Sequence, residues 1–161
     1  MRTTSYKLEQ NLIMGNRAVI TNNTKDGEDY KNNVGIYVHW NGGRDSIEAF
    51  LTYCKLRGFR EPDRHSYGTA RLIQVIANFA GGDGLSVGVD ICKNLDCNNY
   101  DNGVYFIEGW DITRREFEPE REQYNHNLRE MLIDIDEAQP KDQQLGADTI
   151  RELLAVTAIE L

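Results

Sequence analysis

Long apolar runs, cysteine and proline are scarce in this chain of 161 residues, which has three cysteines and three prolines. No stretch approaches the roughly 18 consecutive apolar residues that a membrane-spanning helix needs, and residues 1–13 lack the uninterrupted apolar core of a signal peptide. Three cysteines, an odd number, do not indicate a disulfide framework in a chain of this size. We therefore expect no membrane partner and a location in the reducing cytoplasm.

An excess of basic residues is also missing, which bears on nucleic-acid binding. Lys and Arg number 18 against 26 Asp and Glu, and residues 118–161 alone hold 11 acids and 4 bases of a chain with net charge −8. Because sequence-independent binding to DNA or RNA rests on clustered Lys and Arg, we expect no direct nucleic-acid binding. The acidic segment is typical of a solvated helix face, and alternatively it could contact a basic protein surface, including one that normally holds nucleic acid.

The pattern of residue types divides the chain into three parts. Residues 1–13 show no strong period and form an N-terminal extension, residues 14–117 form a core domain, and residues 118–161 carry two amphipathic stretches separated by Pro140. These stretches predict a C-terminal αα-hairpin. Its apolar stripes need burial, so we expect docking on the core, with a homo-oligomer through these helices as the alternative.

The core domain alternates short strand patterns with two longer helical patterns. Expected elements are strands at 17–21 and 34–38, helices at 46–57 and 67–80, and strands at 85–91 and 104–117. The last segment is either one strand bulged at Gly109 or a tight hairpin around it. This order, about ββααβββ, favours an α+β fold with a small antiparallel sheet packed by two helices. The helix at 67–80 is expected to be the most buried element.

The stretch of greatest functional interest follows the strand at 34–38 and consists of Asn41, Gly42, Gly43 and Arg44. Asp45 is expected to cap the helix that begins there, with Glu48 completing a capping box. A Gly-rich turn before a helix exposes backbone N–H groups at the positive end of the helix dipole, and an Arg side chain suits phosphate or carboxylate. The turn therefore predicts an anion site, although a tight connection that needs glycine for its backbone alone explains the same residues.

Aromatic and polar neighbours extend the predicted site. Trp40 and Tyr67 could stack on a base, and Arg71 belongs to the polar stripe of the helix at 67–80, which could form a pocket wall. Ordinary packing is the alternative for each aromatic residue, and a buried Arg71 would pair with a carboxylate. The candidate ligand-binding residues are thus Trp40, Asn41, Gly42, Gly43, Arg44, Tyr67 and Arg71.

No established catalytic or metal-binding motif stands out. The loop at 96–103 has calcium-like spacing but lacks the closing Glu, so a polar turn is expected. Cys92 and Cys97 have no second pair of zinc ligands nearby, and Cys54 lies on an apolar helix face. We therefore expect no cofactor, no metal and a binding protein rather than an enzyme.

Four segments, MGNRAVIT, HWNGGRDSIEAFL, YGTARLIQVIANF and DNGVYFIEGW, resemble small proteins carried by bacterial phages, prophages and mobile elements. The resemblance covers about residues 14–117 and implies a role against bacterial immunity in the host cytoplasm. Under this hypothesis the chain is a non-catalytic module that sequesters a phosphate-bearing nucleotide signal at the Gly-Gly-Arg turn. The alternative is an inhibitor of a host defence protein, similar to an anti-CRISPR protein, whose acidic tail blocks a basic groove. A small nucleotide-processing enzyme is the third hypothesis.

Overall fold

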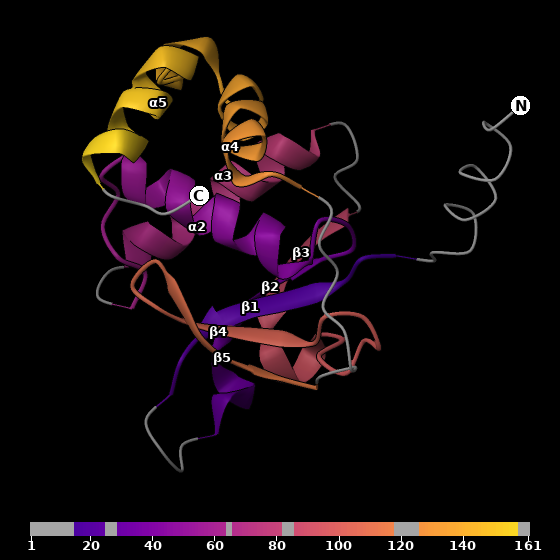
Figure 1. Ribbon diagram of the computed structural model, residues 1–161. Helices are drawn as coiled ribbons and strands as arrows, with labels where there is room; N and C mark the ends of the chain where they lie inside the picture. Colours follow the sequence, from indigo (N-terminus) through magenta and orange to yellow (C-terminus); the bar gives the residue numbers. More distant parts are fainter. Residues whose placement is uncertain (1–14, 25–28, 64–65, 82–85, 118–125, 158–161) are drawn as a thin grey trace, which may run out of the picture.

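The computed structural model describes residues 15–24, 29–63, 66–81, 86–117 and 126–157 (Figure 1). Within these residues, five strands form one sheet in the order β3-β2-β1-β4-β5, and four α-helices lie on one side of it in two layers. The strands are β1 (Ala18–Asn22), β2 (Val34–Val38), β3 (Val87–Ile91), β4 (Val104–Glu108) and β5 (Asp111–Glu116). The helices are α2 (Arg44–Leu56), α3 (Ser66–Ala80), α4 (Leu128–Glu137) and α5 (Ala147–Val156).

The α+β class and the element order ββααβββ followed by a helix pair are confirmed. The sheet differs in one pairing, because β1 and β4 run parallel while the other three neighbouring pairs run antiparallel. A parallel pair needs a long crossover connection, and the chain between β1 and β4 supplies one, since it contains both core helices. The sheet is therefore mixed rather than purely antiparallel.

The segment at 104–117 forms a hairpin around Gly109, which is one of its two predicted forms. Glu108 pairs with Asp111, so Gly109 and Trp110 make a two-residue connection between β4 and β5. Gly109 has φ of 58°, the positive value that a tight hairpin turn requires at its first central position. A register shift between Phe106 and Ile107 adds a bulge to the same hairpin.

The two faces of the sheet carry different cores because side chains alternate along each strand. On the helix-covered face, Ile20, Ile36 and Tyr105 pack into the main hydrophobic core together with α2 and α3. On the opposite face, a smaller cluster forms from Val19, Cys92, Val104 and Phe106, with Tyr30 packed edge-on against Phe106. The sheet thus separates the main core from a satellite core.

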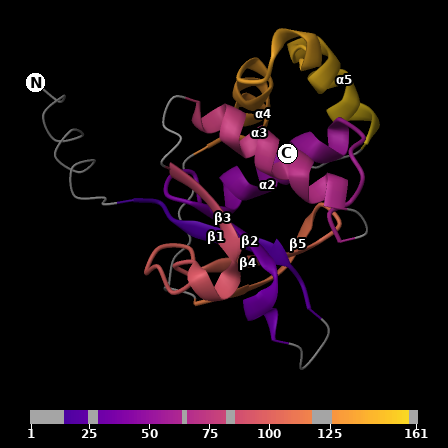
Figure 2. The same cartoon turned by 180° about the vertical axis from the view of Figure 1, so that it is seen from behind.

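The most buried helix is α2 and not α3, which corrects the prediction from sequence. Seven residues of α2 are buried, against four of α3. The reason is the layering, since α2 lies between the sheet and the α4–α5 pair, whereas one side of α3 faces solvent (Figures 1 and 2). On α3, Leu72, Val75 and Ile76 are buried, whereas Ala70 and Ala77 are exposed.

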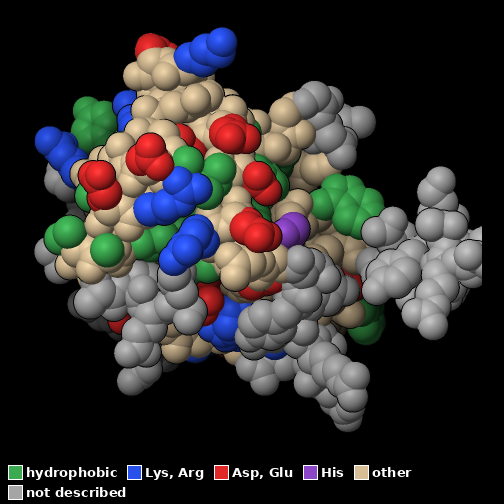
Figure 3. Space-filling model, turned by 45° about the horizontal axis from the view of Figure 1, so that its top comes forward, with side chains coloured by type: hydrophobic (Ala, Val, Ile, Leu, Met, Phe, Trp, Pro, Cys, Tyr) green, Lys and Arg blue, Asp and Glu red, His purple; other side chains and the backbone are tan. Residues whose placement is uncertain are grey.

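The C-terminal helices dock on the core, as expected. Five residues of α4 and α5 belong to the same hydrophobic cluster as the sheet and α2: Met131, Leu132, Ile135, Ile150 and Leu154. The apolar stripes of the described tail are therefore used within the chain. The outward face of these helices mixes acidic with basic side chains, which Figure 3 shows from above.

Two further expectations concern the ends of the chain and membranes. The predicted extension at 1–13 and the first part of the tail, 118–125, lie outside the described residues. Among the helices that the structure describes, none has the length and apolar character needed to cross a membrane.

Candidate functional site

The Gly-rich turn connects the end of β2 to α2 in a conformation that glycine and asparagine tolerate. Asn41 has φ of 59°, a left-handed value that Asn adopts more easily than most residues. Gly43 is the N-cap of α2, which begins at Arg44, two residues earlier than predicted. Asp45 therefore lies inside the first turn, and the predicted capping box with Glu48 is wrong.

Gly42 is required by close packing of backbone against backbone. A Cβ atom at this position would lie 2.4 Å from the Asn16 carbonyl oxygen and 2.7 Å from the Ala18 nitrogen. The Gly42 N–H donates to the same Asn16 oxygen over 2.8 Å. This N–H group is thus already bonded within the fold, which favours the structural explanation of the turn over the anion site.

The positive end of α2 already holds a carboxylate of the chain itself. Asp45 accepts hydrogen bonds from the Ser46 N–H over 2.8 Å and from the His126 N–H over 2.6 Å. The His126 ring is in turn 3.0 Å from the Asn41 amide. A negative charge in the first turn interacts favourably with the helix dipole and repels a second anion. The turn is therefore a contact point for the segment before α4.

Arg44 is held along its own helix. Its guanidinium lies 3.7 Å from the Glu48 carboxylate, one turn further along α2, and 5.5 Å from the centre of the Tyr105 ring. These contacts direct the Arg44 guanidinium toward neighbouring side chains of the same chain. The resulting ion pair is partly exposed and contributes little to stability.

The seven predicted ligand-binding residues do not form one site. Trp40 and Asn41 line a small cavity of about 240 Å³ with Phe79 near the C-terminal end of α3. Tyr67 and Arg71 lie near the N-terminal end of that helix, which rises about 18 Å over the twelve residues from Tyr67 to Phe79. Both are exposed.

Tyr67 and Arg71 contact other surface residues rather than a pocket. Arg60 lies 5.6 Å from the centre of the Tyr67 ring, and Arg71 donates to the Gln74 side chain over 2.9 Å. Successive helical residues are rotated by about 100°, so Arg71 lies about 100° from Ala70 and about 160° from Ile73 and does not face the side of α3 that carries these two residues. The alternative of a buried Arg71 paired with a carboxylate does not hold either, because Arg71 is exposed.

The larger cavity lies between the sheet and the first half of α3. Its volume is about 450 Å³, and its wall combines the helix with the ends of β1, β2 and β4. None of its lining residues was among the seven candidates. The lining consists of Ile20, Thr21, Asn22, Asn33, Val34, Ile36, Pro62, Ser66, Thr69, Ala70, Leu72, Ile73 and Ile107.

The polar edge of this cavity is organised by hydrogen bonds. Thr21 donates its hydroxyl to the Val34 carbonyl over 2.9 Å, and the Asn33 amide donates to the Asn22 carbonyl over 3.2 Å. The second bond orients the Asn33 side chain at the rim, whereas the Thr21 side chain shares the opposite face of the sheet with Val19. The hydroxyl groups of Ser66 and Thr69 lie on the helix side, where each can donate to or accept from a ligand.

No family model, curated protein or solved structure matches the chain. At the turn, the Gly42 N–H already bonds to the Asn16 carbonyl, and the Ser46 N–H in the first turn of α2 already bonds to Asp45. The larger cavity, in contrast, has a wall that can accept a molecule. We take the cavity as the candidate functional site. Sequence reasoning missed it because its lining is drawn from five separate segments.

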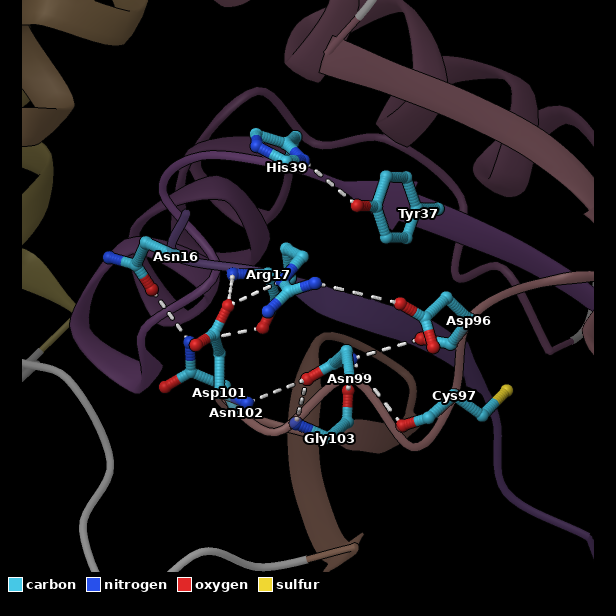
Figure 4. A network of polar contacts seen from close by, with 10 residues as sticks. All are labelled: Asn16, Arg17, Tyr37, His39, Asp96, Cys97, Asn99, Asp101, Asn102 and Gly103. Atoms are coloured by element: carbon cyan, nitrogen blue, oxygen red, sulfur yellow. Dashed lines mark hydrogen bonds and ion pairs between the residues drawn. The ribbon is translucent and has the colours of Figure 1, made fainter. Parts of the chain in front are cut away.

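The loop before β4 is a rigid polar turn, as expected, and Figure 4 shows its network. The buried Asn99 side chain donates to the carbonyl oxygens of Asp96, Cys97 and Gly103 and accepts from the N–H groups of Asp101 and Gly103. Asp101 accepts from the Arg17 side chain over 2.7 Å. Within the described residues, no group of three His, Cys, Asp or Glu side chains is placed to hold a metal ion.

The three cysteines have environments that suppress thiolate chemistry. Burial raises the pKa of Cys54, which is fully buried in the main core, and of Cys92. Burial, followed by the nearby Cys92, raises the pKa of Cys97 to about 11. Because the thiolate is the nucleophile and metal ligand, these thiols are unsuited to catalysis near neutral pH.

Proposed function

We propose that this protein is a non-catalytic binding module whose ligand occupies the larger cavity between α3 and the sheet. The observation that carries the proposal is the lining, in which eight of thirteen residues are apolar and none is charged. The volume of about 450 Å³ lies within the range of roughly 300–1,000 Å³ that is usual for small-molecule sites. A few polar groups at one edge would orient the bound molecule.

The uncharged lining defines the part of the ligand that enters. A phosphate moved from water into this cavity would lose its hydration without gaining a cationic partner, which is costly. The part that enters is therefore an uncharged ring or chain with one hydrogen-bonding edge. A nucleobase has these properties, and its edge can pair with Asn33 and Thr69. A nucleotide would thus bind with its base in the cavity and its phosphate in solvent.

The biological role that we propose is sequestration of such a molecule in a bacterial cytoplasm, as an antagonist of host immunity. This role rests on the resemblance to proteins of phages and mobile elements that the sequence of residues 14–117 suggests, and the cavity supports only the binding part of the proposal. This form of the proposal keeps the nucleotide class expected from the sequence. It moves the ligand from the turn at Arg44 to the cavity beside α3.

Native mass spectrometry of the purified full chain tests the proposal directly. We expect a mass excess, and denaturation should release a compound with an uncharged ring. Isothermal titration with adenosine, guanosine, cytidine and uridine then tests the nucleobase form with defined probes. An apo mass together with no binding of the four nucleosides would overturn the proposal.

Two matched substitutions test the location of the ligand. Ala70→Phe adds a ring at the exposed rim of the cavity and should weaken binding of the released compound at least about tenfold, which corresponds to roughly 1.4 kcal/mol. Ala155→Phe makes the same change at an exposed site on α5 and should leave binding unchanged. Arg44→Ala should also leave it unchanged. Loss of binding in Arg44→Ala with full binding in Ala70→Phe would return the site to the turn.

The protein-inhibitor hypothesis gains no comparable support from the described helices. Their exposed acids are interspersed with bases, so they do not form a surface of one sign (Figure 3). The exposed acids are Glu130, Asp134, Glu137, Asp142, Asp148 and Glu152, and the exposed bases are Arg129, Lys141 and Arg151. Because α4 and α5 share the main core, deleting residues 118–161 would remove part of that core as well as the acidic charge.

A further inference from the structure

Asn22 ends the central strand β1 at a position where its neighbours across the sheet are apolar. The strand pairs Asn22 with Ile107 on β4, and the register with β2 continues from Thr21 opposite Gly35 to Asn22 beside Val34. The four residues before Asn22 on β1 are buried. Asparagine is depleted in strands, where apolar and β-branched residues pack better. Packing alone thus gives no reason for an amide at this position.

The Asn22 side chain lies on the face of the sheet that forms the floor of the larger cavity. Ile20, two positions earlier, packs in the main core, and side chains two positions apart share a face. The adjacent Asn23 lies on the other face, where its side chain accepts from Arg114, whose guanidinium covers the Phe106 ring of the satellite core. Asn22 therefore faces the cavity, of which it is a lining residue.

The fold does not use the Asn22 carboxamide for a bond of its own. The main-chain carbonyl of Asn22 accepts the Asn33 amide over 3.2 Å. Within the part of the chain that the structure describes, the Asn22 carboxamide itself has no hydrogen-bond or ion-pair partner. A half-buried amide without a partner loses part of its hydration without gaining a bond, so its presence calls for an explanation. A ligand in the cavity supplies the missing partner.

The other polar side chains of the lining differ from Asn22 in what they offer. Ser66 and Thr69 each present a single hydroxyl oxygen from the helix side, and Thr21 shares the opposite face of the sheet. The NH₂ group of Asn33 is directed at the Asn22 carbonyl, which leaves its oxygen as an acceptor. Of the lining residues, Asn22 thus presents both an amide donor and an amide acceptor to the cavity.

We propose that Asn22 selects the ligand by pairing with a ring edge on which a hydrogen-bond donor adjoins an acceptor. This inference rests on the proposed function of the cavity and assigns its specificity to one side chain. A carboxamide holds its donor and acceptor side by side, so it forms two parallel hydrogen bonds with such an edge. The common nucleobases carry this edge, whereas hydrocarbon rings and acyl chains do not. The ligand class is therefore a nucleobase-like heterocycle.

Stability without ligand gives the first test, because it separates a role in binding from a role in the fold. Wild type, Asn22→Leu and Asn22→Val are unfolded in urea, dialysed and refolded, so that none retains a bound compound. The urea midpoints of both variants should equal or exceed that of the wild type, since no bond within the fold is lost. Lower midpoints in both variants would show that the fold itself uses the amide, which would overturn the proposal.

Isothermal titration gives the second test, with the nucleoside that binds most tightly and an analogue that lacks its edge donor. The pairs are adenosine with purine riboside, guanosine with 1-methylguanosine, cytidine with pyrimidin-2-one riboside, and uridine with 3-methyluridine. Wild type should prefer the nucleoside at least about tenfold, and Asn22→Leu should discriminate by less than about threefold. Asn98→Leu makes the same change at an exposed asparagine outside the cavity and should discriminate as the wild type does.

The outcomes separate this inference from the proposed function on which it rests. Equal discrimination by wild type and Asn22→Leu would overturn the role of Asn22, while loss of binding in Ala70→Phe would still place the ligand in the cavity. A wild-type chain that binds none of the four nucleosides would overturn the nucleobase class and this inference together. A purely structural role of Asn22 would move the urea midpoint and leave the preference for the nucleoside unchanged.

Discussion

Tyr53 on α2 donates its hydroxyl group to the Asp136 carboxylate on α4 over 2.6 Å, and both side chains are buried. The same carboxylate accepts the Leu145 N–H over 2.8 Å and the Gly146 N–H over 2.9 Å, just before α5. One buried carboxylate on α4 thus satisfies three donors from two other segments. This bond set joins the C-terminal helix pair to the core in a single arrangement.

Replacing Asp136 by Asn should destabilise the protein by about 3 kcal/mol. The amide NH₂ of Asn is itself a donor, so it would face N–H or O–H donors that now bond to a carboxylate oxygen. Urea denaturation followed by circular dichroism measures the loss. The milder variant Tyr53→Phe removes one donor and should cost about 1–2 kcal/mol. If Asp136→Asn were as stable as the wild type, the carboxylate would not be what holds the helix pair.

The protein should lose stability at alkaline pH. Burial raises the pKa of Cys54, and burial together with the bond to Asp136 raises the pKa of Tyr53. As pH rises past the ordinary values of 9.0 for the thiol and 10.0 for the phenol, the unfolded chain releases protons that the folded chain keeps, so the free energy of unfolding falls. Each group contributes up to about 1.4 kcal/mol per pH unit.

Urea titrations at a series of pH values between neutral and strongly alkaline check this dependence. The variants Cys54→Ala and Tyr53→Phe should each show a shallower decline above pH 9.0 and 10.0, respectively, whatever their stability at neutral pH. An unchanged slope in both variants would contradict the assignment. Below those values the wild type should show no loss from these two groups.

Gly42→Ala should destabilise the fold by about 3 kcal/mol, since the new methyl group would overlap the backbone of residues 16–18. Backbone atoms cannot move aside as a flexible side chain can. Gly88→Ala is the matched control, because its Cβ would have ordinary contacts, and it should change stability by less than about 1 kcal/mol. Chemical denaturation of the two variants tests whether Gly42 is required by the fold. Equal stabilities of Gly42→Ala and Gly88→Ala would contradict this role.

Asn99→Ala should loosen the loop before β4. The change removes a fully buried side chain that bonds to four other residues of the loop, leaving buried backbone groups unsatisfied at a cost of about 2–4 kcal/mol. Hydrogen exchange of residues 96–103 should accelerate. The exposed neighbour Asn98 provides the control, and Asn98→Ala should leave exchange rates close to those of the wild type.

Local patterns predicted the elements well. The hairpin around Gly109 was one of two forms that the pattern at 104–117 allowed, and the helix predicted at 46–57 ends at the expected place, just before Gly58. That glycine has φ of 71° and donates to the Lys55 carbonyl while the Phe59 N–H reaches the Cys54 carbonyl, a pairing typical of helix C-termini. Both signals depend on residues a few positions apart, which a sequence displays directly.

The candidate site could not be predicted in the same way. Gly42 and Arg44 resemble an anion site in the sequence, yet Asn16 and Glu48 engage them in the folded chain. The cavity beside α3 has no motif, because Ile20, Val34, Ile73 and Ile107 read individually as ordinary core residues. Only their arrangement leaves a space between them.

The sequence by itself determined the α+β class, the order of strands and helices, and the docking tendency of the amphipathic tail, because periodicity and turn residues act over short distances. The tertiary structure alone decided the parallel pairing of β1 with β4 and the central position of α2. These depend on contacts between residues up to about 85 positions apart, such as Val19 with Val104. Such contacts follow from the packing of whole elements, and no local pattern encodes them.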